Sequence, residues 1–415
     1  MIFTAVADDD TGATDLAGML ADNGVRTVLV LDDDPQRWAE GFDALVLGAG
    51  TRALPPAEAY SRTAAAVQKL WAIHPRVLEI KYCSTFDSTA EGNIGQSIDA
   101  AMDITGVGFT VALPALPVNG RTTYLGHHFV NGQLLSDSPM RDHPLNPMRN
   151  SNLVSHLQTQ TRRRVGLARY PVTRDALKAL ESDGVEIAVL DCVDDADLTR
   201  VCEAIAELRL ISGSSAPAMR LPVLWRERGW WQPRQADVQP RSHSGHGVLI
   251  VSGSCSQATR LQNQWFAVQG GEVQVFDPIA LLEGAAPPIT QSATALVRIS
   301  AEPADRRRVH DWSISHGHTA ASAGLQLAAA FARRVAARVA TQPPAGLIVA
   351  GGETSTAVCR ALRLGALEVG RNIQPGVPVC FPLGGEPFQM VLKSGNFGSP
   401  DFYGVVINRI QGGVQ

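Results

Sequence analysis

Three consecutive aspartates follow the first apolar segment of the chain and could carry chemistry. Asp8, Asp9 and Asp10 come directly after the segment 2–6, and Thr11-Gly12 follows them. Adjacent carboxylates repel one another unless a cation, a proton or a substrate hydroxyl uses one of them. We expect Asp8 or Asp9 to act as a base or to orient a hydroxyl, although a residue here could simply cap a helix. If the strand continues through both, they point to opposite faces and only one can meet a substrate.

A lysine and a hydroxyl-rich loop form the second candidate site. Lys81 ends the apolar segment 77–81, and the loop 82–95 that follows carries Ser84, Asp87 and further hydroxyl groups. Backbone amides, hydroxyls and one cation together suit a carboxylate ligand. We therefore expect Lys81, Ser84 and Asp87 to contact a substrate, with a capped surface loop as the alternative.

Two loops rich in proline and glycine form the third candidate. Asn119 and Arg121 lie in the segment 117–122, and His143 lies in the segment 137–148. Rigid loops that present amide, guanidinium and imidazole groups suit a small polyhydroxylated acid, and the alternative is an ordinary long surface loop. We expect Asn119, Arg121 and His143 to join Asp8 in binding the substrate, with Lys81 and Arg121 holding a carboxylate.

Small residues at three strand ends in the second half of the chain indicate a phosphate site. Glycine lets backbone amides approach phosphate oxygens without a Cβ, and a helix N-terminus adds partial positive charge. Neither the G-x-x-x-x-G-K-[ST] pattern nor G-x-G-x-x-G is present, so the signal rests on the three turns together. The residues expected to bind a nucleotide are Ser254, Ser256, Gly351, Gly352, Glu353, Thr354 and Gly395.

The elements that must position these residues alternate between short apolar strands and helices. Strands are expected at 2–6, 27–31, 44–47, 77–81, 109–113, 186–190, 248–252, 272–276, 295–299, 347–350 and 389–393, and helices at 15–22, 56–73, 94–102 and 320–341. This alternation predicts an α/β protein with two domains, each a mainly parallel sheet flanked by helices. We expect an N-terminal substrate domain at 1–230, a linker at 231–247 and a C-terminal nucleotide domain at 248–415.

Composition narrows the class of protein. The chain of 415 residues is long enough for two cores, and 45% of its residues are hydrophobic while 18% are charged. A net charge of −4 without a basic stripe argues against a nucleic-acid partner. No apolar segment is long enough to span a membrane, and the N-terminus does not resemble a signal peptide. The scattered cysteines are typical of a reduced cytoplasmic protein, and the histidines show no metal-ligand spacing.

As a set, these motifs resemble the four-carbon acid sugar kinase family, formerly a family of uncharacterised function. The Asp-Asp-x-Thr-Gly-Ala opening at 8–13, the Gly-Gly-Glu-Thr turn at 351–354 and the Lys-Ser-Gly-Asn-Phe-Gly segment at 393–398 occur in the family's order and separation. The segments 81–95 and 117–121 resemble the 3-oxo-tetronate kinase branch, and the likeness runs essentially from end to end.

The resemblance implies an enzyme that binds a sugar acid in its N-terminal domain and ATP in its C-terminal domain. It implies transfer of phosphate from ATP, with Mg²⁺, to the C4 hydroxyl of a 3-oxo-tetronate in a cleft between the domains. D-threonate or D-erythronate 4-kinase activity stays open. So do a two-domain dehydrogenase and a silent sugar-acid sensor, although the missing Rossmann pattern and the intact glycine turns count against them. The metal ligands are not assigned, and a homodimer is kept open.

Overall fold

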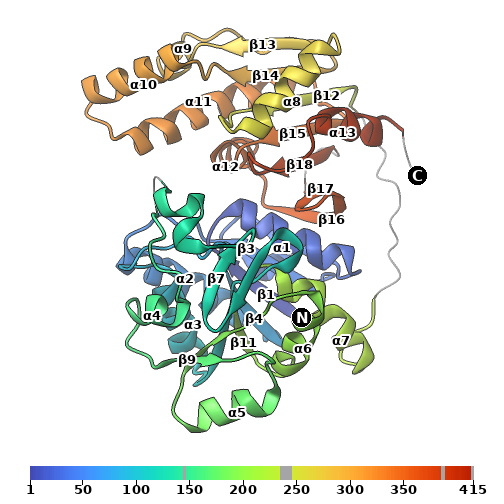
Figure 1. Ribbon diagram of the computed structural model, residues 1–415. Helices are drawn as coiled ribbons and strands as arrows, with labels where there is room; N and C mark the ends of the chain where they lie inside the picture. Colours follow the sequence, from blue (N-terminus) through green and yellow to red (C-terminus); the bar gives the residue numbers. More distant parts are fainter. Residues whose placement is uncertain (144–145, 234–244, 385–387, 413–415) are drawn as a thin grey trace. The chain divides into compact units, whose positions relative to one another are not determined.

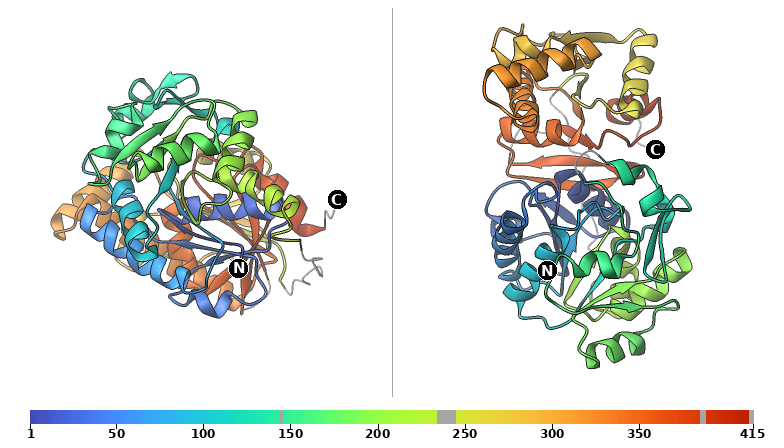
Figure 2. Two further views of the ribbon diagram at one scale, coloured as in Figure 1. Left: turned by 90° about the horizontal axis from the view of Figure 1, so that it is seen from below. Right: turned by 60° about the vertical axis from the view of Figure 1, so that its left-hand side comes forward.

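The computed structural model describes residues 1–143, 146–233, 245–384 and 388–412. The chain divides into two compact units, Met1–Ala236 and Asp237–Gln415, called here the N-terminal and C-terminal domains. Most of the expected linker at 231–247 lies outside the described residues. Figures 1 and 2 show that each domain, taken by itself, has helices on both sides of its sheet.

The N-terminal domain is built on a sheet whose strands are all parallel in the described residues. Their order is β2 (Thr27–Val30), β3 (Ala44–Gly48), β1 (Phe3–Ala7), β4 (Val77–Lys81), β11 (Leu210–Gly213), β5 (Thr110–Leu113), β10 (Ile187–Leu190) and β9 (Val165–Ala168). These strands are short and nearly continuously apolar because helices cover both faces of a parallel sheet.

The strand order of this sheet reverses direction at β1. From β1 the chain continues to β2 and β3 on one side and then returns to β4 on the other side. Polypeptide at the carboxyl ends of such strands forms the crevice where open α/β sheets bind ligands. The loops after β1, β3 and β4 all meet at this edge, so they are the natural place for the site.

The helices of this domain fall into two groups around the sheet. α1 (Asp10–Asp22), α6 (Asp195–Ile205) and α7 (Leu221–Glu227) all contact the short 3-10 helix η5 (Ala216–Met219). α2 (Pro56–Trp71) packs with α3 (Ile94–Thr105). Two further helices are α4 (Leu153–Gln158) and α5 (Arg174–Ser182). Their starts follow ordinary capping rules, since Asn152, Thr173 and Asp194 each accept a bond from the first helical turn.

A small antiparallel sheet interrupts this domain. It consists of β6 (Arg121–Tyr124), β7 (His127–Val130) and β8 (Gln133–Leu134). An isolated bridge between Thr123 and Cys192 links it to the segment after β10. Loops were expected at 117–122 and 137–148, and no strand was predicted between them. β7 places His128 next to the loop that follows β4.

The C-terminal domain has a mixed, mainly parallel sheet. In order, its strands are β13 (Glu272–Phe276), β14 (Ala295–Ile299), β12 (Val248–Ser252), β15 (Gly346–Ala350), β18 (Gln389–Lys393), β17 (Val377–Leu383) and β16 (Ala366–Gln374). The first five are parallel, and β17 is antiparallel to both of its neighbours. Its first four strands have the same order as β2, β3, β1 and β4, so the strand order of this sheet reverses at β12.

Two layers of helix enclose that sheet. α8 (Gln257–Val268) and α13 (Phe402–Gln411) form one layer, and α9 (Pro278–Leu282), α10 (Pro303–Ser315), α11 (Ala320–Thr341) and α12 (Gly352–Ala361) form the other. Aromatic residues of α8 and α13, including Phe266 and Phe402, pack on Ile250 and Val391 of the sheet. The predicted α/β class is confirmed. No helix within the described residues is long and apolar enough to cross a membrane.

Candidate functional site

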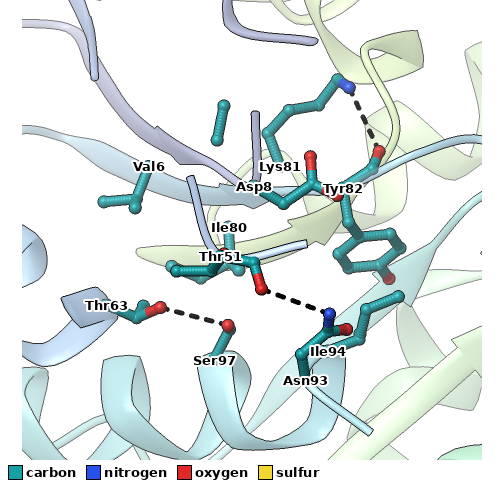
Figure 3. Close-up of a pocket in the computed structure, with 11 residues that line it drawn as sticks. Val6, Asp8, Thr51, Thr63, Ile80, Lys81, Tyr82, Asn93, Ile94 and Ser97 are labelled. Carbon is teal, nitrogen blue, oxygen red and sulfur yellow. Dashed lines mark hydrogen bonds between the residues drawn. The ribbon is translucent and has the colours of Figure 1, made fainter. Parts of the chain in front are cut away.

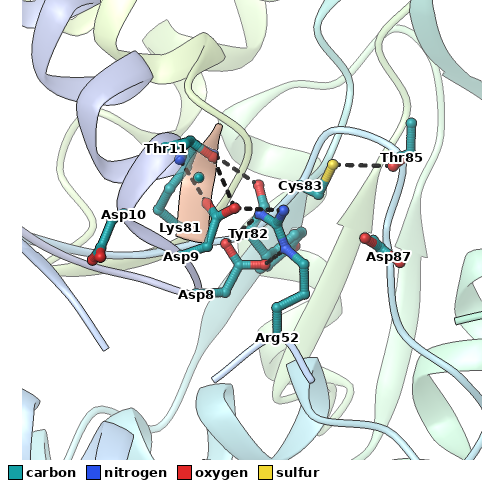
Figure 4. Close-up of polar contacts among 12 residues, drawn as sticks. Asp8, Asp9, Asp10, Thr11, Arg52, Lys81, Tyr82, Cys83, Thr85 and Asp87 are labelled. Carbon is teal, nitrogen blue, oxygen red and sulfur yellow. Dashed lines mark hydrogen bonds and ion pairs between the residues drawn. The ribbon is translucent and has the colours of Figure 1, made fainter. Parts of the chain in front are cut away.

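The acidic loop after β1 is organised by an arginine. The Arg52 guanidinium donates to both Asp8 oxygens, with Nε–Oδ2 and Nη2–Oδ1 distances of 2.8 Å. Its third nitrogen, Nη1, lies 2.7 Å from Asp9 Oδ2 (Figure 4). A bidentate guanidinium–carboxylate pair fixes orientation as well as charge. Arg52 thus holds both carboxylates at the carboxyl end of β1, with a quarter of its own side chain exposed.

The strand does not continue through the two aspartates, so the condition under which they would point to opposite faces is not met. β1 ends at Ala7, and the chain turns at Asp8 into α1. Asp9 is the N-cap of this helix, and its Oδ1 accepts from Gly12 N at 2.6 Å. Asp8 is held by backbone bonds instead, because its carbonyl accepts from the amides of Thr51 and Arg52. Asp9 therefore has a capping role as well as an ion pair.

Lys81 lies beneath the acidic loop and is almost completely buried, with 3% of its surface exposed. Its Nζ donates to Tyr82 O at 3.1 Å, and a Cβ on Gly12 would lie 3.1 Å from it. Two buried carboxyl groups share this region: Asp15, whose Oδ2 accepts from Ser215 at 2.5 Å, and Glu79 on the same strand. Burial raises the pKa of Asp15, and the charge of Lys81 opposes that shift.

Glu79 gives this region a pH dependence that can be measured. It is fully buried, its oxygens have no hydrogen-bond partner among the described residues, and burial raises its pKa to about 8. The folded state thus binds a proton that the unfolded chain releases above pH 4.5. Stability should fall as pH rises from about 4.5 to 8. We expect Glu79→Gln to melt above the wild type by a margin that grows across this interval, measured by thermal unfolding. A constant margin would contradict it.

Two buried histidines hold the hydroxyl-rich loop after β4. His128 Nε2 donates to Ser84 O at 2.8 Å, and His156 Nε2 donates to Ser88 O at 2.8 Å. Burial lowers the pKa of His128 to about 4 and also lowers that of His156, so both rings are neutral. Because a carbonyl can only accept, each ring carries its proton on Nε2. They fix the loop and are not acid–base groups.

The remaining candidates for binding the acid form two smaller groups. Asp87 is buried, burial raises its pKa, and its Oδ1 lies 3.6 Å from His143 Nδ1. Arg121 donates through Nη1 to the carbonyl of Asn119, and its Nε has no partner among the described residues. The segment after His143 includes two positions, 144 and 145, that lie outside the described residues.

A small cavity lies under the acidic loop (Figure 3). Asp8, Thr51, Lys81 and Asn93 are among the residues that line it, and its volume is about 10 Å³. A cavity of that size holds about one water and not a sugar acid. Asn93 donates to the carbonyls of Thr51 and Arg52, so it positions the turn that carries the arginine.

In the C-terminal domain, three turns converge at the carboxyl ends of β12, β15 and β18. Gly351 has φ +122°, and a Cβ on it would lie 3.2 Å from Ser254 N. A Cβ on Gly395 would lie 2.3 Å from Ser254 Oγ, and one on Gly253 would lie 2.0 Å from Thr354 Oγ1. These close approaches require glycine. They bring Ser254, Gly351, Thr354 and Gly395 together, and the binding of a nucleotide by these residues stays a prediction.

The first turns of two helices border the same place. Ser256 is the N-cap of α8, and its hydroxyl also donates to Gly395 O at 2.5 Å. Gly352 begins α12, so its amide is one of the free donors at that N-terminus. Glu353 is exposed, and its Oε2 would lie 3.8 Å from a Cβ on Gly324 of α11. Its carboxylate therefore does not join the convergent turns.

Sequence reasoning missed Arg52 and Lys393. Arg52 lies four residues beyond β3, and the expectation that carboxyl ends of neighbouring strands meet could have identified it. Lys393 ends β18 and is fully buried, and its Nζ donates to Thr259 Oγ1 at 3.1 Å. The signal in the sequence is a lysine at the end of an apolar strand, the same feature that marks Lys81.

Known protein families match the two domains of the chain separately. Residues 3–221 match the family model of a sugar-binding N-terminal domain, and residues 249–403 match that of a nucleotide-binding C-terminal domain. The chain is 39% identical over 425 residues to a 3-oxo-tetronate kinase of Cupriavidus necator, covering 98% of this chain and 96% of that protein. It is 36% identical to a 3-oxo-tetronate kinase of Escherichia coli K12, covering 89% and 97% respectively.

Solved structures show the same relationship. A protein of Salmonella typhimurium LT2 superposes with a TM-score of 0.81 at 33% identity, covering 98% of this chain and 99% of that one. A protein of Haemophilus influenzae gives a TM-score of 0.75 at 30% identity, covering 99% and 100%. Membership of a kinase family argues against the dehydrogenase alternative, and the matched nucleotide-binding domain argues against a sensor that has lost this site. The chain belongs to the four-carbon acid sugar kinase family, with a sugar-binding and a nucleotide-binding domain.

Proposed function

We propose that this chain is a cytoplasmic, ATP-dependent kinase that phosphorylates the C4 hydroxyl of 3-oxo-tetronate to give 3-oxo-tetronate 4-phosphate. The observation that carries the proposal is the pair of carboxylates held by Arg52 at the carboxyl end of β1, inside a sugar-binding domain. The names of the relatives support the choice of acid. D-threonate and D-erythronate are the alternative substrates.

Asp8 is our candidate for the group that orients the C4 hydroxyl and takes its proton. Phosphoryl transfer asks little covalent chemistry of the protein and depends on positioning and charge stabilisation. Asp8 is anchored through its backbone to Thr51 and through its carboxylate to Arg52, so its orientation is fixed before substrate arrives. Asp9 shares Arg52 but also caps α1, which makes it the less available of the two.

Arg121 and the loop after β4 are the candidates for holding the acid's carboxylate. The Nε of Arg121 has no hydrogen-bond partner within the described ranges, and the loop that carries Ser84 and Asp87 is fixed by neutral histidines. Lys81 is too deeply buried to contact the acid's carboxylate directly. Its positive charge would instead attract that carboxylate from beneath the acidic loop. This assigns Lys81 an electrostatic role in the proposal, with Asn119 and His143 at the edge of the site.

ATP would bind at the convergent turns of the C-terminal domain, through Ser254, Ser256, Gly351, Gly352, Thr354 and Gly395. Within the described residues, no group of three or more side chains suited to a metal ion forms. Mg²⁺ in phosphoryl-transfer sites is usually held by the phosphates with one or two carboxylates. We therefore propose that Mg²⁺ binds together with the nucleotide, mainly through its phosphates, and not at a site built from protein side chains alone.

An ADP-release assay across a panel of four-carbon acids tests this function. The panel contains 3-oxo-tetronate, D-threonate, D-erythronate and their enantiomers, each with ATP and Mg²⁺. We expect 3-oxo-tetronate to give the highest kcat/KM and the product to carry phosphate on C4. A higher kcat/KM for D-threonate or D-erythronate would favour the alternative, and no ADP release with any acid would contradict the proposal.

A further inference from the structure

Lys393 is a buried cation at the edge of the convergent turns. It is the last residue of β18, and none of its surface is exposed. Side chains alternate along a strand, so Lys393 lies on the same face as Val391, which packs in the core beneath α8 and α13. Its stem is therefore enclosed by apolar groups, and its ammonium emerges at the first turn of α8.

The ammonium is hydrogen-bonded only to neutral oxygens in the described part of the chain. Nζ donates to Thr259 Oγ1 at 3.1 Å, Ser394 O at 3.1 Å and Gly395 O at 3.2 Å. The strand-end lysine of the other domain, Lys81, has Asp15 and Glu79 in electrostatic contact. Among the described residues Lys393 has no such carboxylate, so its positive charge is buried there without a counter-charge from this part of the chain.

The described residues of the neighbouring elements supply no charged partner for Lys393. Glu353 and Arg360 of α12 and Arg260 of α8 are exposed. Tyr403 of α13 donates its hydroxyl to Asn263, and burial raises the pKa of the Cys380 thiol on β17 to about 12. Burial lowers the pKa of Lys393 to about 8, and no charged group in the described structure opposes this shift. An isolated buried charge is costly, so a site that keeps one usually has a reason.

We propose that Lys393 is a positioning residue of the nucleotide site, whose buried charge is balanced by the phosphates of bound ATP and whose ammonium fixes the Ser394–Gly395 turn. The proposal rests on the assignment of ATP to these turns. Gly395 O is the shared acceptor, because it also accepts from Ser256 Oγ and Thr259 Oγ1. Lys393 thereby ties the glycine turn to the first turn of α8, whose free amides would face the phosphates.

The arrangement makes ATP binding depend on the protonation of Lys393. In the free protein the ammonium loses its proton around pH 8, and bound phosphates would retain it to higher pH. Each unit by which ATP raises the pKa corresponds to a tenfold preference of ATP for the charged form. ATP binding should therefore take up protons near pH 8 and weaken as pH rises above 8.

The stability of the free protein should change with pH in the opposite direction to ATP binding. A lysine whose pKa is lowered from 10.5 to about 8 on folding holds fewer protons in the folded state than in the unfolded state. The free protein should therefore gain stability between about pH 8 and 10.5 while ATP binding weakens. A residue with only a structural role would not show these opposite trends.

The test is calorimetric titration of the full chain with MgATP from pH 7.5 to 9.5, in buffers of different ionisation enthalpy so that proton uptake is measured. The variants are Lys393→Met and Lys393→Arg, with Lys178→Met, an exposed lysine of α5 in the other domain, as the control. We expect Lys393→Met to weaken ATP binding by about tenfold at pH 7.5 and to abolish both the pH dependence and the proton uptake. Lys178→Met should bind ATP as the wild type does.

Lys393→Arg keeps the result decisive if the methionine variant does not fold. Arginine stays charged throughout this range, so the arginine variant should bind ATP with no proton uptake and a flat pH profile. A wild-type profile in either Lys393 variant would overturn the inference. If the wild type binds no MgATP, the assigned nucleotide site fails with it. If the wild type binds MgATP and the variants match it, only the role of Lys393 fails.

Discussion

Replacing Asp8 by asparagine should lower kcat by about 10²–10⁴-fold while the protein still folds and binds ATP. The amide keeps the shape of the carboxylate but cannot accept the proton of a hydroxyl. ATP binding should survive because the nucleotide turns belong to the other domain. The measurement is steady-state ADP release with 3-oxo-tetronate, accompanied by thermal unfolding and an ATP titration of the same preparation.

Asp9→Asn is the matched control, because it changes the neighbouring carboxylate held by the same arginine. Asparagine is as good an N-cap as aspartate, so the bond to Gly12 N can persist and α1 should keep its start. We expect Asp9→Asn to lose much less activity than Asp8→Asn. If both variants keep near-normal kcat but melt at lower temperature, the carboxylates are structural, and Asp87 with His143 becomes the next candidate for the base.

Much of the fold could be read from hydrophobic pattern because the central strands are short, apolar and fully buried. β4, β12, β13, β14 and β18 begin and end where the pattern places them. β16 and β17 were not predicted. Their sequences contain charged residues, such as the partly exposed Glu368, and prolines, such as the buried Pro382, so the apolar signal of a buried strand is weak.

Only part of the candidate site could be predicted from the sequence, because some of its contacts join residues that are far apart in the chain. Asp8, Lys81 and Gly395 stand in motifs that are local in sequence, and the fold places them at strand ends as expected. Arg52 lies 44 residues from Asp8, and His128 lies 44 residues from Ser84. Their contacts depend on which strands are neighbours and on the small sheet β6–β8, and single-sequence periodicity does not give strand order.

The second large effect should come from Gly351→Val in the nucleotide domain. Gly351 has φ +122°, a conformation that strains a β-branched residue by about 1–3 kcal/mol. Its new Cβ would also lie 3.2 Å from Ser254 N, and a backbone atom cannot move aside as a side chain can. The turns of β12 and β15 would have to separate, and the amides that should receive the phosphates would move with them.

We therefore expect Gly351→Val to raise KM for ATP by about tenfold or more, since about 1.4 kcal/mol of lost binding corresponds to a factor of ten. KM for the acid should change little, because the sugar-binding domain is a separate unit of the chain. Gly284→Val is the matched control: Gly284 also has a positive φ, +76°, but a Cβ there meets no atom within 4 Å. Steady-state kinetics with each substrate varied in turn measures both constants. Equal increases in the two KM values, or an equal effect of Gly284→Val on ATP, would mean that the change acts through stability and not through the phosphate turn.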